Sequence, residues 1–95
     1  MTTATPRDRY VSFDGLECDD NATQIVDTIR RYIAIPDKAG QWADYFSSKL
    51  NEKERLQVDD LFFVGSQMNN IYALFEELGD DAAHELLYQV EQECC

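Results

Sequence analysis

The sequence predicts an all-α protein, folded as a small antiparallel four-helix bundle with an extended N-terminal arm. Apolar residues recur at three- or four-residue spacing along most of the chain, which is the period of an amphipathic helix. Residues that cap or stop helices separate these stretches. The 95 residues suffice for one domain, so we expect a single helical domain over 1–95, with helices at about 21–35, 37–54, 59–78 and 80–93.

The first 20 residues are polar and acidic. Residues 1–8 are predicted to form a loose tail, and residues 9–15 an extended arm, because Arg9 to Phe13 alternate in the manner of a strand and Asp14-Gly15 is typical of a turn. There is no apolar segment typical of a secretory signal and no run of 18 apolar residues. We therefore expect a cytoplasmic protein that does not interact with membranes.

The helix predicted at 21–35 has Asp20 or Asn21 as its N-cap, because a side-chain oxygen there can accept from a free backbone N–H. Pro36 should end it, since the residue before a proline is disfavoured in the α region. The apolar residues that fall on one face are Ala22, Ile25, Val26, Ile29, Tyr32 and Ile33.

The helix predicted at 37–54 has Asp37 as its cap. Asn51 and Glu54 leave two alternatives open, either a capping box that starts a new turn or a helix that continues to Arg55. In both cases we expect a break between Arg55 and Val58. The apolar stripe consists of Ala39, Trp42, Tyr45, Phe46 and Leu50.

The helix predicted at 59–78 carries apolar residues over about half of its circumference, with Phe62 alone on the polar side. Gly79 should end it, because glycine tolerates the left-handed conformation. Asp80 and Asp81 open the helix predicted at 80–93, where carboxylates interact favourably with the helix dipole. Its apolar face consists of Ala83, Leu86, Leu87, Val90 and Cys94.

Charge is distributed unevenly along the chain. The formal net charge is -11, which makes nucleic acid and anionic membranes implausible partners. All eight basic residues lie between Arg7 and Arg55, and residues 56–95 hold nine carboxylates. This half either keeps the protein soluble or docks on a basic patch of a larger protein. A homodimer through the broad apolar face of residues 59–78 stays open.

Few residues are typical of catalysis or of a metal site. His84 is the only histidine and is predicted to lie on the surface. Three cysteines without a secretory signal argue against a disulfide framework, so Cys94 is expected to pack as a small apolar residue. We expect no cofactor and no enzymatic activity, because no nucleophile, phosphate-binding or dinucleotide motif is present. The alternative is a thiol site for a soft metal formed by Cys18, Cys94 and Cys95.

Both ends of the chain resemble a known family. The opening residues Asp8 to Phe13, followed by Gly15, Cys18-Asp19 and Asn21-Ala22, are similar to the start of CowN, a small family that sustains nitrogen fixation. Residues 91–95, with sequence EQECC, are similar to its acidic, double-cysteine end. The segments Asp59-Asp60-Leu61 and Leu74-Phe75-Glu76-Glu77 also fit, so that the resemblance covers nearly the whole chain.

This resemblance implies a protein that lets nitrogenase keep working in the presence of carbon monoxide, and it carries no catalytic motif. We predict a non-enzymatic protein that shields nitrogenase by docking, with the molybdenum–iron component as the expected partner. The alternative is a small thiol-based metal-binding or redox protein that uses the three cysteines. The candidate partner-binding residues are Phe62, Glu76, Glu77, Asp80, Asp81 and Glu85.

Overall fold

The computed structural model describes residues 14–94, with side chains described from Cys18 onward. This part of the chain forms helices and no strand, which confirms the all-α prediction. The predicted tail and residues 9–13 of the predicted arm lie outside the described residues. The helices are α1 (Asp14–Ala34), α2 (Trp42–Leu56), α3 (Asp60–Ser66), α4 (Met68–Leu78) and α5 (Asp81–Cys94).

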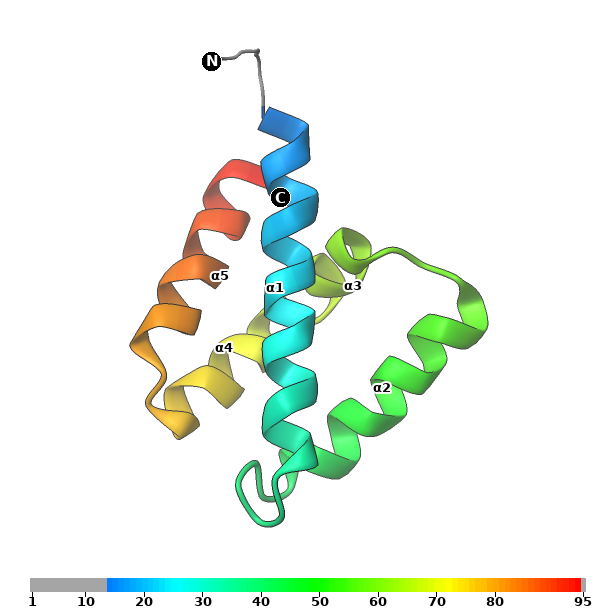
Figure 1. Ribbon diagram of the computed structural model, residues 1–95, viewed down its shortest axis with the longest axis vertical. Coiled ribbons are helices and arrows are strands. Elements are labelled where there is room, and N and C mark those ends of the chain that lie inside the picture. Colours follow the sequence, from blue (N-terminus) through cyan, green and yellow to red (C-terminus); the bar gives the residue numbers. More distant parts are fainter. Residues whose placement is uncertain (1–13, 95) are drawn as a thin grey trace.

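Helix α1 is the centre of the arrangement (Figure 1). It runs along the long axis of the molecule and packs against α2, α3 and α5, while α4 packs against α5 and α3. The core therefore lies between α1 and the helices around it. Its buried side chains are Ala22, Ile25, Val26, Ile29, Ala39, Phe46, Leu50, Phe63, Val64, Met68, Ile71, Leu74, Phe75, Leu87 and Val90.

Helix α1 begins seven residues earlier than the sequence predicts. The turn predicted at Asp14-Gly15 and the cap predicted at Asp20 or Asn21 are wrong, because all four residues are helical. The first turns of α1 lie beside the end of α5, and this packing stabilises turns that have little apolar character of their own. The end of α1 at Ala34, just before Pro36, agrees with the prediction.

The connection from α1 to α2 is longer than predicted. Asp37 has φ 65° and Gly40 has φ 57°, so both residues are in the left-handed region and Asp37 does not cap a helix. Helix α2 therefore starts at Trp42 and not at 37. It continues through Asn51 and Glu54 to Leu56, and the left-handed Gln57 ends it, which confirms a break between Arg55 and Val58.

The stretch predicted as one helix at 59–78 is divided at Gln67 into α3 and α4. A polar network occupies this break: the Tyr45 hydroxyl donates to Gln67 Oε1 at 2.6 Å, and Asn70 Nδ2 donates to the Tyr45 oxygen at 2.8 Å. These bonds fix the Gln67 side chain against α2, while its backbone N–H still donates to Phe63 O and its C=O still accepts from Ile71 N. The predicted starts and ends at Asp59 and Gly79 are confirmed, with Asp59 accepting from Phe62 N and Gly79 at φ 70°.

None of the helices in the described part of the chain is long and apolar enough to cross a membrane.

Candidate functional site: an acidic corner

The turn between α4 and α5 gathers five carboxylates at one end of the molecule, which we call the acidic corner (Figure 1). The left-handed Gly79 reverses the chain, so that the last turn of α4 and the first turns of α5 meet there. No lysine or arginine occurs in residues 56–95, so His84 on α5 is the one basic side chain that these two helices supply. The structure thus brings together the predicted acidic residues Glu76, Glu77, Asp80, Asp81 and Glu85; of these, only Asp80 is partly buried.

Neutral aromatic groups hold two of these carboxylates in place. The Tyr32 hydroxyl on α1 donates to Asp80 Oδ2 at 2.5 Å, and Trp42 Nε1 on α2 donates to Glu77 Oε1 at 3.1 Å. A phenol or an indole orients a carboxylate without neutralising its charge. Donors from two helices, α1 and α2, therefore hold Asp80 and Glu77 in position without neutralising them.

Asp80 has a structural role as well. Its Oδ1 accepts from Ala83 N at 3.0 Å and so caps α5. The hydrogen bond from Tyr32, together with the bond from Ala83 N, lowers the pKa of Asp80, and the same contact raises the pKa of Tyr32. Both shifts keep Asp80 ionised and Tyr32 protonated, which is the state that the hydrogen bond requires.

A second set of polar contacts continues from the acidic corner along α5. His84 Nε2 lies 3.3 Å from Glu76 Oε2, and the ring of His84 is 5.0 Å from the ring of Tyr72. The Tyr72 hydroxyl donates to Glu91 Oε1 at 2.6 Å, and burial together with this bond raises the pKa of Tyr72. His84 is partly exposed, in line with its predicted place off the core.

The other side of the molecule pairs its charges. Lys53 Nζ lies 2.8 Å from Asp60 Oδ1, joining α2 to α3, and the Lys53 side chain is only 12% exposed. Burial acts to raise the pKa of Asp60, but hydrogen bonds from Lys53 and Thr23 outweigh it and lower the pKa. Within the described residues, the ion pairs made by lysine or arginine all lie here: Lys53–Asp60, Arg30–Glu54, Lys49–Glu52 and Arg55–Glu52.

Phe62 is on this second side and not at the acidic corner. It is 63% exposed, as the sequence predicts, and lies with Leu56, which is 59% exposed, in a shallow groove between α2 and α3. None of the five corner carboxylates lines this groove. The predicted partner-binding residues therefore occupy two separate surfaces. The groove is lined by Lys49, Glu52, Lys53, Leu56, Val58, Phe62, Phe63, Ser66 and Gln67.

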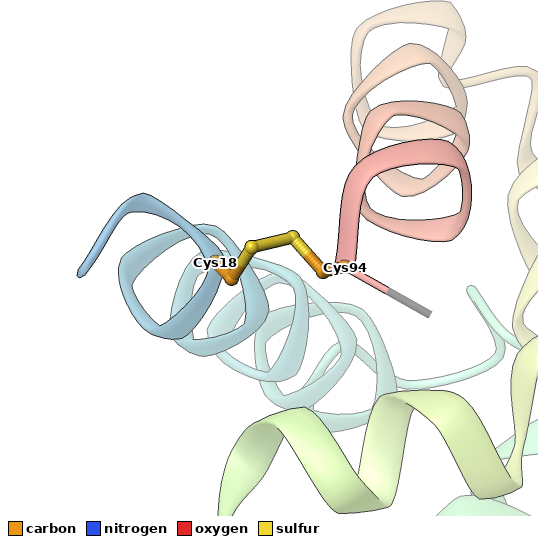
Figure 2. Close-up of a disulfide and its surroundings, with 2 residues drawn as sticks. All are labelled: Cys18 and Cys94. Carbon is orange, nitrogen blue, oxygen red and sulfur yellow. A yellow bond between two sulfur atoms is a disulfide. The ribbon is translucent and has the colours of Figure 1, made fainter. Parts of the chain in front are cut away.

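The cysteines differ from the sequence-based expectation. Cys18 and Cys94 form a disulfide across 76 residues of sequence, with their Cα atoms 5.8 Å apart (Figure 2). The expectation that Cys94 packs only as a small apolar residue is wrong. That expectation was based on the odd number of cysteines. The fold places the end of α5 beside the start of α1, so that Cys94 meets Cys18. Cys95 lies outside the described residues.

The predicted thiol site for a metal gains no further ligand from the fold. Among the side chains of residues 18–94, no group of three His, Cys, Asp or Glu is close enough to hold a metal ion. A sulfur in a disulfide has no thiolate to offer, so metal binding by Cys18 and Cys94 would first require reduction.

Sequence reasoning missed the roles of the aromatic donors. Tyr32 and Trp42 were assigned to apolar stripes only, and Tyr72 to the apolar face of the helix predicted at 59–78. Each is half-buried and carries a polar group at the edge of the core. A tyrosine or tryptophan at the edge of an apolar stripe is the signal that would have found them, because its polar end needs a partner there.

The sequence matches one protein family over nearly its whole length. The family model "N2-fixation sustaining protein CowN" matches residues 2–95. The chain is 46% identical to the N(2)-fixation sustaining protein CowN of Cereibacter sphaeroides (strain KD131) over 95 residues, covering all of both chains. It is 48% identical to the protein of the same name from Allochromatium vinosum over 88 residues, which is 93% of this chain and 92% of that one. No solved structure matches.

Proposed function

This chain belongs to the CowN family of N2-fixation sustaining proteins, and on that premise we propose that it sustains nitrogen fixation by shielding nitrogenase from carbon monoxide. It acts without catalysis, by docking on the molybdenum–iron component. The family resemblance in the sequence supports the role. The surface of the molecule supports docking as the means.

The observation that carries the proposal is the gathering of five carboxylates at the acidic corner, where α4 and α5 supply no lysine or arginine. Tyr32 and Trp42 orient Asp80 and Glu77 with neutral groups, while the lysine and arginine ion pairs of the described residues lie on the α2 side. Carboxylates that neutral donors hold in place, as Asp80 and Glu77 are held, suit a basic patch on a partner, because little side-chain entropy is lost on binding. We infer that the acidic corner is the principal docking surface.

Phe62 is proposed as a second, apolar contact in the same docking. With Leu56 it forms the most exposed pair of large apolar side chains in the described residues. Exposed aromatic groups are frequent energetic anchors of protein interfaces, whereas charges at a rim mainly set the association rate and its dependence on salt. The two surfaces therefore predict different kinetic effects: loss of the corner slows association, and loss of Phe62 speeds dissociation.

The decisive experiment measures binding to purified nitrogenase components, with and without carbon monoxide, by cross-linking and surface kinetics. The test variant is Glu76→Gln, Glu77→Gln, Asp81→Asn and Glu85→Gln. Asp80 is left intact because it caps α5 and bonds Tyr32. We expect slower association with the molybdenum–iron component, most strongly at low salt, and weaker protection of turnover from carbon monoxide.

A matched control removes the same amount of charge elsewhere. Asp20, Asp27, Asp37 and Asp44 are all exposed and lie outside the acidic corner, so their joint replacement by Asn changes the net charge equally. This control should bind and protect nearly as the natural protein does. Equal loss in both variants would mean that only net charge matters, and full protection by the test variant would contradict the acidic corner as a docking surface.

The apolar contact has its own pair of variants. Phe62→Ser removes the ring from the groove, and Tyr88→Ser removes a ring of comparable exposure, 50%, from α5. We expect faster dissociation from the molybdenum–iron component for Phe62→Ser alone. Unchanged dissociation would exclude Phe62 from the interface while leaving the acidic corner untouched.

The alternative function is a thiol-based redox or metal-binding protein. The observation that favours it is the Cys18–Cys94 bond, which shows that two of the three cysteines meet in the fold. A variant with Cys18, Cys94 and Cys95 all replaced by Ser separates the two functions. Full protection by this variant would remove the alternative, whereas lost protection with intact binding to nitrogenase would favour it.

A further inference from the structure

The disulfide joins the first turns of α1 to the last turn of α5 (Figure 2). Both Cys18 and Cys94 are partly exposed, so a thiol in solution can reach the bond. The bond closes nearly the whole chain into one loop, and a cross-link over a long loop restricts the unfolded chain strongly. Opening this bond should therefore lower the stability of the fold more than opening a bond over a short loop would.

Other contacts hold α5 whether or not this bond is present. Leu87 and Val90 are completely buried against the core, and Glu91 accepts from Tyr72. At the start of the helix, Asp80 accepts from Tyr32. Because these contacts lie at or before Glu91, opening the bond releases residues 92–94 of the last turn while the rest of α5 stays in place.

The surroundings of the bond are acidic. Asp19 and Asp20 follow Cys18 on α1 and are exposed, and Glu93 precedes Cys94 on α5 and is exposed. A thiolate that carries further carboxylates is repelled from such a site, whereas a thiol with an amino group is attracted to it. This charge effect falls with rising salt, since it acts between exposed groups.

We propose that Cys18 and Cys94 form a reversible redox site that exchanges with neutral or cationic thiols in preference to anionic ones, and that its reduction frees the last turn of α5. One thiolate attacks a sulfur of the pair, the S–S bond breaks, and the departing sulfur takes a proton. A second thiolate then attacks the mixed disulfide and releases the other cysteine. The protein gains two electrons and two protons, and the reductant becomes a disulfide. The proposal does not depend on docking to nitrogenase.

The first test follows reduction of the folded protein over time. Free thiols are alkylated at intervals, and the mass of the alkylated protein is measured by mass spectrometry. Cysteamine, dithiothreitol and glutathione, compared at equal thiolate concentration, represent cationic, neutral and anionic thiols. At low salt we expect cysteamine to react several-fold faster than glutathione, with the difference shrinking at high salt. Resistance of the bond in the folded protein, or equal rates at low salt, would overturn the proposal.

The second test measures amide hydrogen exchange and melting before and after reduction. Residues 92–94 should exchange faster, residues 63–75 should keep their protection, and the melting temperature should fall by about 10 °C or more. The variant Cys18→Ser/Cys94→Ser should show the same changes without reductant and no response to thiols. Cys95→Ser serves as the control, because it keeps the bond and should keep the response.

Two outcomes would overturn the release of α5. One is unchanged exchange of residues 92–94 after reduction. The other is global loss of helix, either in the reduced protein or in the Cys18→Ser/Cys94→Ser variant, because the bond would then hold the whole fold and not one turn.

Discussion

The two sides of α1 treat charge in opposite ways. On the α2 and α3 side, basic and acidic side chains pair, as in Lys53–Asp60 and Arg30–Glu54. On the α4 and α5 side, carboxylates meet neutral donors such as Tyr32, Trp42 and Tyr72. Five of the 19 acidic residues are therefore gathered at the acidic corner, where α4 and α5 supply no lysine or arginine.

This difference separates the side of the molecule that carries the docking charge from the side whose charges are paired. Repulsion among the carboxylates of α4 and α5 costs free energy, and it is offset there by buried side chains, helix capping and the disulfide. On the α2 side, pairs such as Arg30–Glu54 are exposed and contribute little to stability, whereas Lys53–Asp60 is largely buried. The strongly held side is thus the one whose charge stays free to attract a partner.

The largest expected effect comes from removing the main apolar anchor of α2. Phe46→Ala should lower the free energy of unfolding by about 3–5 kcal/mol, because a fully buried ring leaves a cavity. Amides of α2 should then exchange faster than those of α5, which the disulfide still ties to α1. Leu87→Ala is the comparison on the other side, and identical exchange patterns in the two variants would mean that the sides open as one unit.

A smaller effect is expected from the cap of α5. Asp80→Ala removes the hydrogen bonds to Ala83 N and from Tyr32 and should cost about 1–2 kcal/mol in urea unfolding. Asp81→Ala, at the exposed neighbouring position, should cost about 0.5 kcal/mol or less. Equal losses of unfolding free energy in the two variants would show that the negative charge near the start of α5 matters, and not the specific hydrogen bonds of Asp80.

Lowering the pH should decrease the stability of both sides of the molecule. The pKa values of Asp80 and Asp60 are lowered in the folded protein, so the stability they contribute is present above the unfolded value of about 3.9. It is lost as the pH falls through the folded values. Urea unfolding over this range should show a falling free energy, and Asp80→Asn should flatten the slope. An unchanged slope in that variant would rule out Asp80 as a source.

The smallest effect belongs to the exposed ion pairs. Arg30 and Glu54 lie 3.2 Å apart with side chains 42% and 64% exposed, so a double-mutant cycle with alanine should give a coupling of about 0.2–1 kcal/mol. The coupling should decrease at high salt. A larger value that persists at high salt would mean that the α2 side depends on its ion pairs and not on its apolar contacts.

Local chemistry predicted the helix ends well. Pro36 limits α1, Gly79 ends α4 with a left-handed residue, and the break after Arg55 is found at Gln57. Each of these depends on backbone preferences of one or two residues, which sequence reveals directly. The gathering of carboxylates at the α4–α5 turn was predictable for the same reason, because the residues involved are close in sequence.

The features that sequence did not predict depend on distant residues. The early turns of α1 pack against α5, the break at Gln67 is stabilised by Tyr45 on another helix, and Cys18 meets Cys94 across 76 residues. Phe62 was correctly expected to be exposed, and it lies in a groove that none of the corner carboxylates lines. The spacing of apolar residues predicts which face of a helix is buried, but it does not predict which other helices pack against that face.

Trp42 gives these two sides a common spectroscopic reporter. It is the single tryptophan of the chain, and its indole on α2 donates to Glu77 on α4. Its emission will change when the junction between the sides opens, whereas far-ultraviolet circular dichroism follows the helices as a whole. Comparing the two signals during one denaturant titration will show, without any attached label, whether α2 detaches before the remaining helices melt.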